Sequence, residues 1–185
     1  YLRGVPFVQI PTTLQAQVDS SVGGKVAVDH PRGKNLIGAF YQPTLVIADI
    51  GTLSTLEPRQ MVAGMAEVIK YGIIWDKQFL AYVDEHMEEI YRLDPAVLTW
   101  VIKRSCQIKS EIVGQDERDE DVRTILNYGH TIGHALEVHT GYRTYLHGEA
   151  ISIGMSLAAE ISLRLGNLSL KERTVIDRVL QKAGL

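Results

Sequence analysis

The stretch VRTILNYGHTIGHALEV, residues 122–138, has the spacing of one amphipathic helix with an unusual polar face. At about 3.6 residues per turn, its polar side chains fall on a single stripe made of Arg123, Asn127, His130, His134 and Glu137. Gly129 and Gly133 lie off this stripe, and each costs about 1 kcal/mol of helix stability relative to alanine. Two such glycines, one turn apart, indicate a helix that is pressed closely against a neighbour.

The polar stripe faces either water or a cleft. A solvated helix face usually carries pairs of lysine and glutamate, whereas an asparagine and two histidines are unusual there. Two histidines four residues apart can reach one cation or one substrate. A zinc protease with a helical histidine pair needs glutamate directly after the first histidine. Thr131 follows His130 in this chain, which excludes that class of enzyme.

Three further residues each have a structural and a functional interpretation. His147 precedes an apolar helix, where a histidine is a cap, a core residue or a ligand. Glu67, three residues before Lys70, forms either an exposed ion pair or the oxygen ligand that completes a Glu/His/His zinc site with an open position. Lys109 lies on the expected buried face of its helix, so its amine either extends to solvent or meets an anion in a cleft. The spacing alone leaves each of these choices open.

The chain divides into a short strand-and-loop part and a longer helical part. Helical periodicity and capping signals predict helices at 58–73, 77–91, 95–114, 122–138, 148–165 and 170–183. Before them, short apolar runs predict strands at 5–10 and 45–48, with a tight hairpin turn at Gly23-Gly24. About the first fifty residues are therefore strand and loop, and the remainder is a helical bundle.

The composition is that of a globular protein. Of the 185 residues, 45% are hydrophobic and 22% are charged, which excludes disorder as the main state. Lysine and arginine number 19 against 22 acidic residues, so no global basic field exists to hold nucleic acid or an anionic membrane. Cys106 is the single cysteine, which excludes a disulfide framework and a cysteine-based zinc site and fits a reducing cytoplasm. No apolar run is long enough to span a bilayer.

Five stretches of the chain resemble the 3-dehydroquinate synthase family. They are PTTLQAQVDSSVGGK (11–25), GKNLIGAF (33–40), MAEVIKYG (65–72), LNYGHTIGHA (126–135) and HGE (147–149). They occur in the family's order and extend over most of the chain, whereas residues 76–96 carry no family signature.

The resemblance implies an architecture and a reaction. The fold is α/β plus all-α, dehydroquinate synthase-like, with the end of an NAD-binding domain at 1–57 and an incomplete helical zinc- and substrate-binding domain at 58–185. The activity is that of a carbon–oxygen lyase of the shikimate pathway, which leads to chorismate and the aromatic amino acids. It converts 3-deoxy-D-arabino-heptulosonate 7-phosphate to 3-dehydroquinate and phosphate. In that family NAD+ oxidises the C5 hydroxyl, phosphate leaves, the ketone is reduced again, and an aldol closure forms the ring.

The resemblance also implies cofactors and site residues. The zinc ligands are Glu67, His130 and His147, with cobalt as an alternative metal. The NAD site is lined by Thr12, Thr13, Asp19, Lys25, Lys34, Thr52, Leu53, Ser54 and Thr55. The substrate is bound by Arg3, Asn35, Lys70, Lys109, Arg123 and Asn127, of which the last four also take part in catalysis together with His134. The expected protein is a cytoplasmic homodimer with a sugar-phosphate substrate and no nucleic-acid or membrane partner.

Compared with that family, the chain lacks the first nucleotide-binding strands with their glycine-rich loop, and the last helices. We therefore expect it to be part of a longer protein. Three other functions remain: a sister sugar-phosphate cyclase of the 2-deoxy-scyllo-inosose synthase type, a metal-dependent polyol dehydrogenase of the glycerol dehydrogenase type, and a non-catalytic helical interaction module. Arg123 and Asn127 favour the dehydroquinate enzyme over the sister cyclase. Together with Lys109 they suit an anionic substrate, which a polyol dehydrogenase does not have. The third leaves the histidine stripe unexplained.

Overall fold

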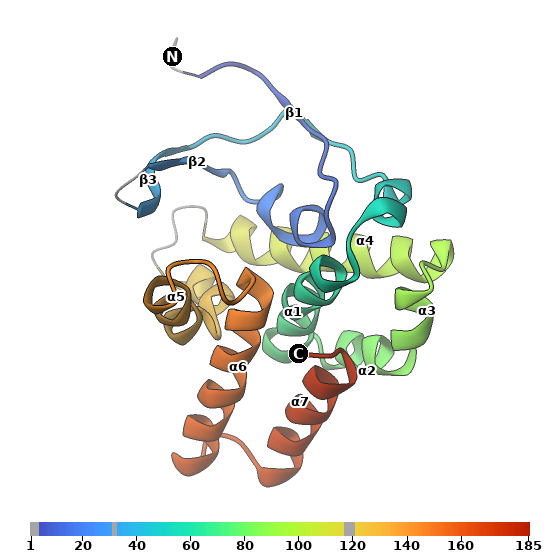
Figure 1. The fold of residues 1–185 in the computed structure, drawn as a ribbon, viewed down its shortest axis with the longest axis vertical. Helices are drawn as coiled ribbons and strands as arrows, with labels where there is room; N and C mark the ends of the chain where they lie inside the picture. Colours follow the sequence, from blue (N-terminus) through green and yellow to red (C-terminus); the bar gives the residue numbers. More distant parts are fainter. Residues whose placement is uncertain (1–3, 31–32, 117–120) are drawn as a thin grey trace.

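The computed structural model describes residues 4–30, 33–116 and 121–185. Four short strands lie at the N-terminal end, and the helices form the rest of the molecule (Figure 1). The helices are α1 (Pro58–Ile74), α2 (Lys77–Glu85), α3 (Met87–Tyr91), α4 (Pro95–Gln115), α5 (His130–His139), α6 (His147–Arg164) and α7 (Leu170–Lys182). The predicted strand-and-loop part followed by a helical part is confirmed.

Helix α1 is the centre of the bundle and packs against α2, α4 and α6. It begins with Pro58, whose missing N–H is tolerated in the first turn of a helix. Its apolar residues Met61, Met65, Val68 and Ile69 are all buried. Because neighbours cover several sides of α1, polar residues elsewhere on this helix also lie inside the protein.

The prediction of one helix over 77–91 is wrong, because the chain forms α2 and α3 with a break at His86. The His86 ring stacks on Tyr82, and its Nδ1 lies 3.1 Å from the Tyr82 carbonyl oxygen, which is the acceptor for the final turn of α2. The other predicted helices of the bundle agree with the structure to within two residues, apart from the stretch 122–138.

The prediction of one continuous helix over 122–138 is also wrong. Residues Val122–Asn127 form a 3₁₀ helix, η3, and α5 begins only at His130. Between them Gly129 has a φ of +80°, a left-handed conformation that favours glycine and breaks the helix. The polar stripe calculated for one helix therefore comes from two segments that meet at an angle.

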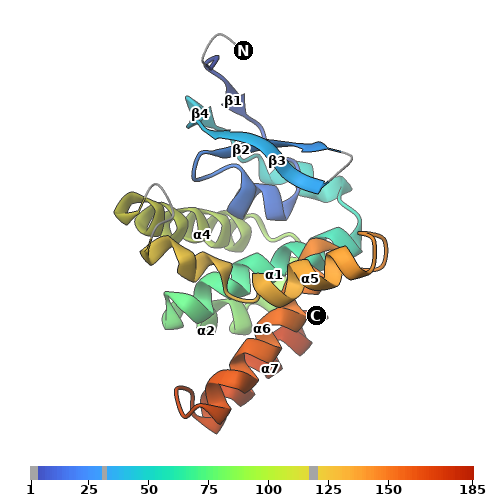
Figure 2. The ribbon, with the colours of Figure 1, turned by 90° about the vertical axis from the view of Figure 1, so that its left-hand side faces the viewer.

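The expectation of close packing at the two glycines is confirmed. Helix α5 packs along α6, as two views of the ribbon show (Figures 1 and 2). A Cβ atom on Gly133 would lie 2.8 Å from the Ile151 side chain, and one on Gly129 would lie 2.7 Å from the Ile151 carbonyl oxygen. The glycines let α5 approach α6 closely enough for the residues at the start of both helices to converge.

We expect Gly129→Ala to lower the free energy of unfolding by about 2–5 kcal/mol. The left-handed backbone conformation costs an L-residue about 1–2 kcal/mol, and overpacking costs about 1–3 kcal/mol. Gly141→Ala is the matched control, because Gly141 has a φ of +61° but no atom within 4 Å of its added Cβ. Urea unfolding of both variants measures the difference, and equal losses would show that packing at Gly129 contributes nothing.

The strands form two separate pairs. Strands β1 (Val8–Gln9) and β4 (Leu45–Val46) pair in parallel, whereas β2 (Lys25–His30) and β3 (Gly33–Phe40) pair antiparallel. The predicted strands at 5–10 and 45–48 are confirmed in shortened form, but β2 and β3 were not predicted.

The predicted hairpin turn at Gly23-Gly24 is wrong, because Lys25 pairs with Phe40 and His30 pairs with Gly33, so both glycines precede the first strand of the hairpin. Gly23 and Gly24, both with positive φ, instead lead from a π-helical turn, η1 (Ala16–Ser20), into β2. The Gly23 carbonyl accepts a 2.8 Å hydrogen bond from Arg123 Nη2. A Cβ on Gly23 would lie 3.0 Å from that nitrogen, so the glycine pair provides a close approach as well as a turn.

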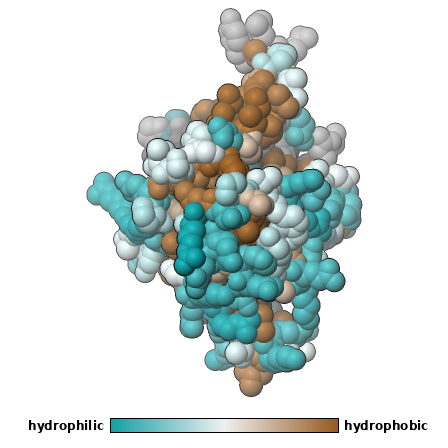
Figure 3. Space-filling model, turned by 90° about the vertical axis from the view of Figure 1, so that its right-hand side faces the viewer, coloured by the Kyte–Doolittle hydropathy of each residue, from teal (hydrophilic) through white to brown (hydrophobic). Residues whose placement is uncertain are grey.

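Apolar surface gathers around the strand end of the molecule (Figure 3). Its exposed apolar residues include Val5, Val8, Ile10, Leu45 and Ile47. Parallel strands are normally covered on both faces, so this pair is not a finished sheet within the described residues. No described helix combines the length and the apolar character needed to cross a membrane.

Candidate metal and substrate site

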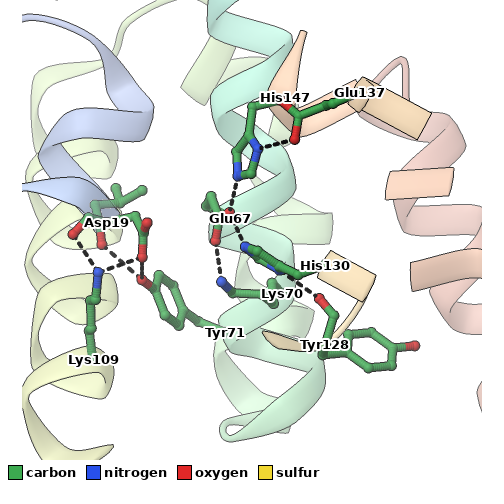
Figure 4. Close-up of polar contacts among 10 residues, drawn as sticks. Asp19, Glu67, Lys70, Tyr71, Lys109, Tyr128, His130, Glu137 and His147 are labelled. Carbon is green, nitrogen blue, oxygen red and sulfur yellow. Dashed lines mark hydrogen bonds and ion pairs between the residues drawn. The ribbon is translucent and has the colours of Figure 1, made fainter. Parts of the chain in front are cut away.

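Glu67, His130 and His147 converge from three different helices, α1, α5 and α6 (Figure 4). The Glu67 carboxylate is completely buried in the middle of α1. Its Oε1 atom lies 3.6 Å from His130 Nε2 and 3.4 Å from His147 Nε2. One donor atom from each of the three residues lies within 4.8 Å of the others, so a single metal ion can contact all three.

Both histidines are oriented through the opposite ring nitrogen. His130 Nδ1 lies 3.2 Å from the Tyr128 carbonyl oxygen, and His147 Nδ1 lies 3.3 Å from Glu137 Oε2. A carbonyl and a carboxylate only accept hydrogen bonds, so each Nδ1 carries the proton. The Nε2 atom of each ring then faces Glu67, as it faces the metal in sites with a hydrogen-bonded outer shell.

These residues fit a cation. The Oε1 atom of the buried Glu67 carboxylate faces the two ring nitrogens, and Oε2 forms an ion pair with Lys70. Two ring nitrogens and Oε1 present lone pairs to one another, an arrangement that repels unless positive charge lies between them. A Glu/His/His set with an open fourth position is typical of catalytic zinc.

The protonation of the histidines agrees with this interpretation. Burial, together with the Lys70 ammonium, lowers the pKa of His130 to about 4, so its ring is neutral near pH 7. Burial also disfavours the charged form of His147, but Glu67 and Glu137 outweigh it and raise the pKa of His147. The carboxylates around His147 therefore draw positive charge to this point, either as a proton or as a metal.

The interpretation of Glu67 and Lys70 as an exposed ion pair is wrong. Both side chains are buried, and both belong to the centre of α1. Burial would raise the pKa of Glu67, but the Lys70 ammonium holds that pKa below its usual value. Removing one member of a buried ion pair leaves the other charge uncompensated, at a cost of about 3–5 kcal/mol.

A cationic pocket is lined in part by His130, one of the three candidate ligands. Its charged lining includes the side chains of Lys25, Lys70, Lys109 and Arg123. The remaining lining residues are Asp19, Leu126, Asn127 and His130. Four cations around one small pocket, next to a candidate metal site, suit a substrate that carries anionic groups.

Lys109 is buried, as predicted, and meets an anion. Its Nζ donates to the Asp19 carbonyl oxygen at 2.6 Å and to Asp19 Oδ1 at 2.7 Å. Asp19 Oδ1 also accepts a 2.7 Å hydrogen bond from the Tyr71 hydroxyl. Burial opposes the Asp19 charge, but Lys109 and Lys70 hold the pKa of Asp19 far below its usual value. Asp19 therefore stays ionised and holds Lys109 at the pocket.

Arg123 and Asn127, both predicted on the polar stripe, lie on η3 and reach the same pocket. The Arg123 side chain is buried and anchored to Gly23, whereas Asn127 is exposed. These residues lie beside His130 because the chain breaks at Gly129, and not because one continuous helix carries all of them, as was predicted.

His134 and Asn35 lie in a second, adjoining pocket. Its other lining residues are Gln15, Glu137, Tyr142 and His147. The His134 ring centroid is 5.3 Å from that of His130 and 5.8 Å from that of His147. His134 is exposed, so it is open to a substrate that reaches the three ligands.

The residues predicted for NAD are more dispersed. Asp19 and Lys25 line the cationic pocket, and Lys34 lies in β3. Thr52, Leu53, Ser54 and Thr55 belong to a 3₁₀ helix, η2 (Ile50–Thr55). The hydroxyls of Thr52, Ser54 and Thr55 donate to backbone carbonyls of the same turn, and Leu53 is part of the core. The Thr13 hydroxyl accepts a hydrogen bond from the Ala16 N–H, and Thr12 is exposed. Arg3, which was predicted to bind the substrate, lies outside the described residues.

The sequence did not identify the roles of Glu137, Tyr71 or Gln17. The position of Glu137 on the polar stripe with the histidines could have indicated that it belongs to the site. Nothing in the sequence indicated a role for Tyr71, apart from its position directly after Lys70. Gln17 is buried and donates to the carbonyl oxygens of Pro11 and Asp49, so it ties η1 to the segment before η2.

Comparisons with known proteins identify the family of the chain. Two family models match the chain from end to end, one described as 3-dehydroquinate synthase N-terminal over residues 1–63 and one as 3-dehydroquinate synthase C-terminal over residues 64–185. The 3-dehydroquinate synthase of Pelotomaculum thermopropionicum is 55% identical over 100% of this chain and 50% of its own length. That of Desulforamulus reducens is 56% identical over 100% of this chain and 52% of its own length. The chain thus spans about half the length of the curated relatives it matches.

Solved structures of related cyclases have the same fold. A 2-epi-5-epi-valiolone synthase of Streptomyces hygroscopicus, solved with NAD+ and Zn2+ bound, superposes with a TM-score of 0.92 at 27% identity, over 100% of this chain and 52% of that one. A 2-deoxy-scyllo-inosose synthase complexed with carbaglucose-6-phosphate, NAD+ and Co2+ gives a TM-score of 0.91 at 33% identity, over 100% of this chain and 50% of that one. The predicted dehydroquinate synthase-like fold is confirmed, and the chain belongs to the 3-dehydroquinate synthase family.

Proposed function

We propose that the complete protein is a 3-dehydroquinate synthase, which converts 3-deoxy-D-arabino-heptulosonate 7-phosphate to 3-dehydroquinate and phosphate. The observation that carries this proposal is the convergence of Glu67, His130 and His147 beside a pocket lined by four cations. A sugar acid phosphate carries both a phosphate and a carboxylate, and these cations match such a substrate. We place the enzyme in the shikimate pathway and in the cytoplasm, as a homodimer, because the family resemblance implies all three.

The proposed metal ligands are Glu67, His130 and His147. When bound, a zinc or cobalt ion would polarise a substrate hydroxyl, and NAD+ would accept and later return a hydride. Lys70 and Lys109 enter the pocket from α1 and α4, and we propose that they bind the anionic groups of the substrate together with Arg123. Because three of these cations are buried, their attraction for an anion is less screened than at the surface.

His134 is the proposed proton-transfer residue. It lies beside the ligands His130 and His147, in the pocket that also holds Asn35. A fourth protein ligand would close the position that a substrate hydroxyl needs, so His134 is better used as a hydrogen-bond partner of the substrate. An imidazole can both take up and release a proton near neutral pH.

The strands support a division of the chain into two domains. We propose that residues 1–57 complete an NAD-binding α/β domain and that residues 58–185 form the metal- and substrate-binding domain. The uncovered apolar faces of β1 and β4 support this, because a parallel pair belongs in a larger covered sheet. The proposed nucleotide residues Thr12, Thr13, Asp19, Lys25, Lys34 and 52–55 lie in or next to this part.

A sister sugar-phosphate cyclase is the second candidate, because two cyclases of other specificity share this fold with TM-scores of 0.92 and 0.91. The curated relatives at 55% and 56% identity favour the dehydroquinate enzyme. A polyol dehydrogenase of the glycerol dehydrogenase type has no need of Lys70, Lys109 and Arg123 around its substrate.

One assay separates these functions. The complete protein is supplied with NAD+, Zn2+ and either the heptulosonate phosphate, glucose 6-phosphate or glycerol, and phosphate and NADH are both measured. We expect phosphate release from the heptulosonate phosphate alone, without accumulation of NADH. Phosphate release from glucose 6-phosphate alone would identify a sister cyclase, and NADH formed from glycerol would identify a dehydrogenase.

Replacement of Lys25 should weaken NAD binding. Lys25 follows the Gly23-Gly24 turn and lines the pocket, so its ammonium can reach a phosphate of the nucleotide. A hydrogen bond to a charged group contributes about 1.5–3 kcal/mol, so we expect Lys25→Ala to raise the Kd of NAD+ about 10- to 100-fold. Calorimetry on the complete protein measures this, with exposed Lys103→Ala as the control. Unchanged NAD+ affinity, or simultaneous loss of zinc, would refute this role.

A further inference from the structure

Glu137 is the one residue of the predicted polar stripe for which the family resemblance implied no role. It lies on α5, and only 5% of its side chain is exposed. A carboxylate this deeply buried is costly unless it is paired or hydrogen-bonded. Its Oε2 lies 3.3 Å from His147 Nδ1, across the close contact between α5 and α6 (Figure 4).

The two ring nitrogens of His147 have different neighbours. Nδ1 faces Glu137 and Nε2 faces Glu67, at 3.3 Å and 3.4 Å. The Glu137 carboxylate accepts the Nδ1 proton, which fixes the ring orientation and the tautomer with its lone pair on Nε2. His130 is oriented differently, because its Nδ1 faces the neutral carbonyl of Tyr128. An ionised acceptor makes the imidazole a stronger electron donor than a neutral acceptor does.

We propose that Glu137 is a positioning residue, which holds the His147 ring with Nε2 directed at the metal and increases its strength as a ligand. This rests on the proposed function, since it takes Glu67, His130 and His147 as the ligands. Glu137 could itself be a ligand, because donor atoms of His134, Glu137 and His147 also lie within 4.8 Å of one another. That alternative would use Nδ1 of His147 and leave the buried Glu67 Oε1 without a cation, so the geometry favours the positioning role.

The test compares two substitutions in the complete protein. Glu137→Met removes the acceptor at similar volume, and Glu137→Gln keeps a carbonyl that still accepts the Nδ1 proton. Loss of an outer-shell partner weakens metal binding about 10- to 100-fold, which is our expectation for the Kd of Zn2+ in Glu137→Met. Glu137→Gln should give an intermediate Kd, because its amide oxygen still orients the ring but carries no charge. Glu160→Met and Glu160→Gln are the matched controls, because Glu160 lies far along α6 and pairs with Arg164.

The measurements are Zn2+ affinity by competition with a chelating dye, thermal unfolding of the metal-free variants, and the visible spectrum of the Co2+-loaded forms. Saturated Glu137→Met should keep the wild-type cobalt spectrum, because the three ligands are unchanged. Wild-type Zn2+ affinity in Glu137→Met would overturn the positioning role and leave the proposed ligand set standing. An altered cobalt spectrum would make Glu137 a ligand. Glu67→Gln is run in parallel, and if it kept its zinc, the proposed ligand set itself would fail.

Discussion

Glu67→Gln should lose most of its metal and, with it, the release of phosphate. The amide that replaces the carboxylate has no charge, and a neutral amide oxygen is a weak ligand for zinc. We expect the Kd of Zn2+ to rise more than about 100-fold, beyond the range for residues that only orient a ligand. Metal content after dialysis and phosphate release measure the two effects. Glutamine keeps the volume of the buried side chain and an acceptor for Lys70.

Two controls make this result interpretable. Glu57→Gln changes the same residue type at an exposed position just before α1 and should keep its zinc. His130→Ala removes a ligand without touching the buried pair of Glu67 and Lys70, and it should lose zinc in the same way. If both variants at Glu67 and His130 retained one zinc per chain, the ligand assignment would be wrong.

His134→Ala should keep near-normal zinc and lose about 10²–10⁴-fold in turnover, the usual range for a lost general acid or base. The reason is geometric, because His134 is exposed beside the ligands and is not one of the two histidines whose Nε2 lies near Glu67 Oε1. The matched control is His139→Ala, at the end of the same helix, which should change neither quantity.

The zinc content and turnover of His134→Ala are to be compared with those of His130→Ala. The two histidines lie one turn apart on α5, and their rings are 5.3 Å apart. Zinc content and turnover should fall together in His130→Ala, whereas only turnover falls in His134→Ala. Equal zinc loss in the two variants would make His134 a ligand and would contradict its role in proton transfer.

Much of the helical part could be predicted because its signals are local. Helical periodicity and capping signals marked α1 and α4, and Lys109 lies on the buried face that was expected of its helix. The break at Gly129 could not be seen in the same way. A glycine inside a helical pattern either packs against a neighbour or adopts a left-handed φ, and Gly129 does both because α6 lies against it.

The candidate site could also be predicted only in part from local patterns in the sequence. Spacing indicated that His130 and His134 share a face, but it could not bring Glu67 and His147 to them from other helices. Likewise, Lys109 was expected on a buried face, yet only the tertiary structure shows Asp19 as its partner, 90 residues away. The role of the Gly23-Gly24 pair depended on contact with Arg123, 100 residues away, which no local pattern encodes.

The most direct test of the proposed metal site is X-ray diffraction from crystals of the complete protein, with data collected on both sides of the zinc absorption edge. We predict one anomalous peak bounded by Glu67 Oε1, His130 Nε2 and His147 Nε2, at about 2.0–2.2 Å from each after the side chains close on the ion. A peak bounded by His134, Glu137 and His147, or no peak beside Glu67 in zinc-loaded active protein, would contradict it.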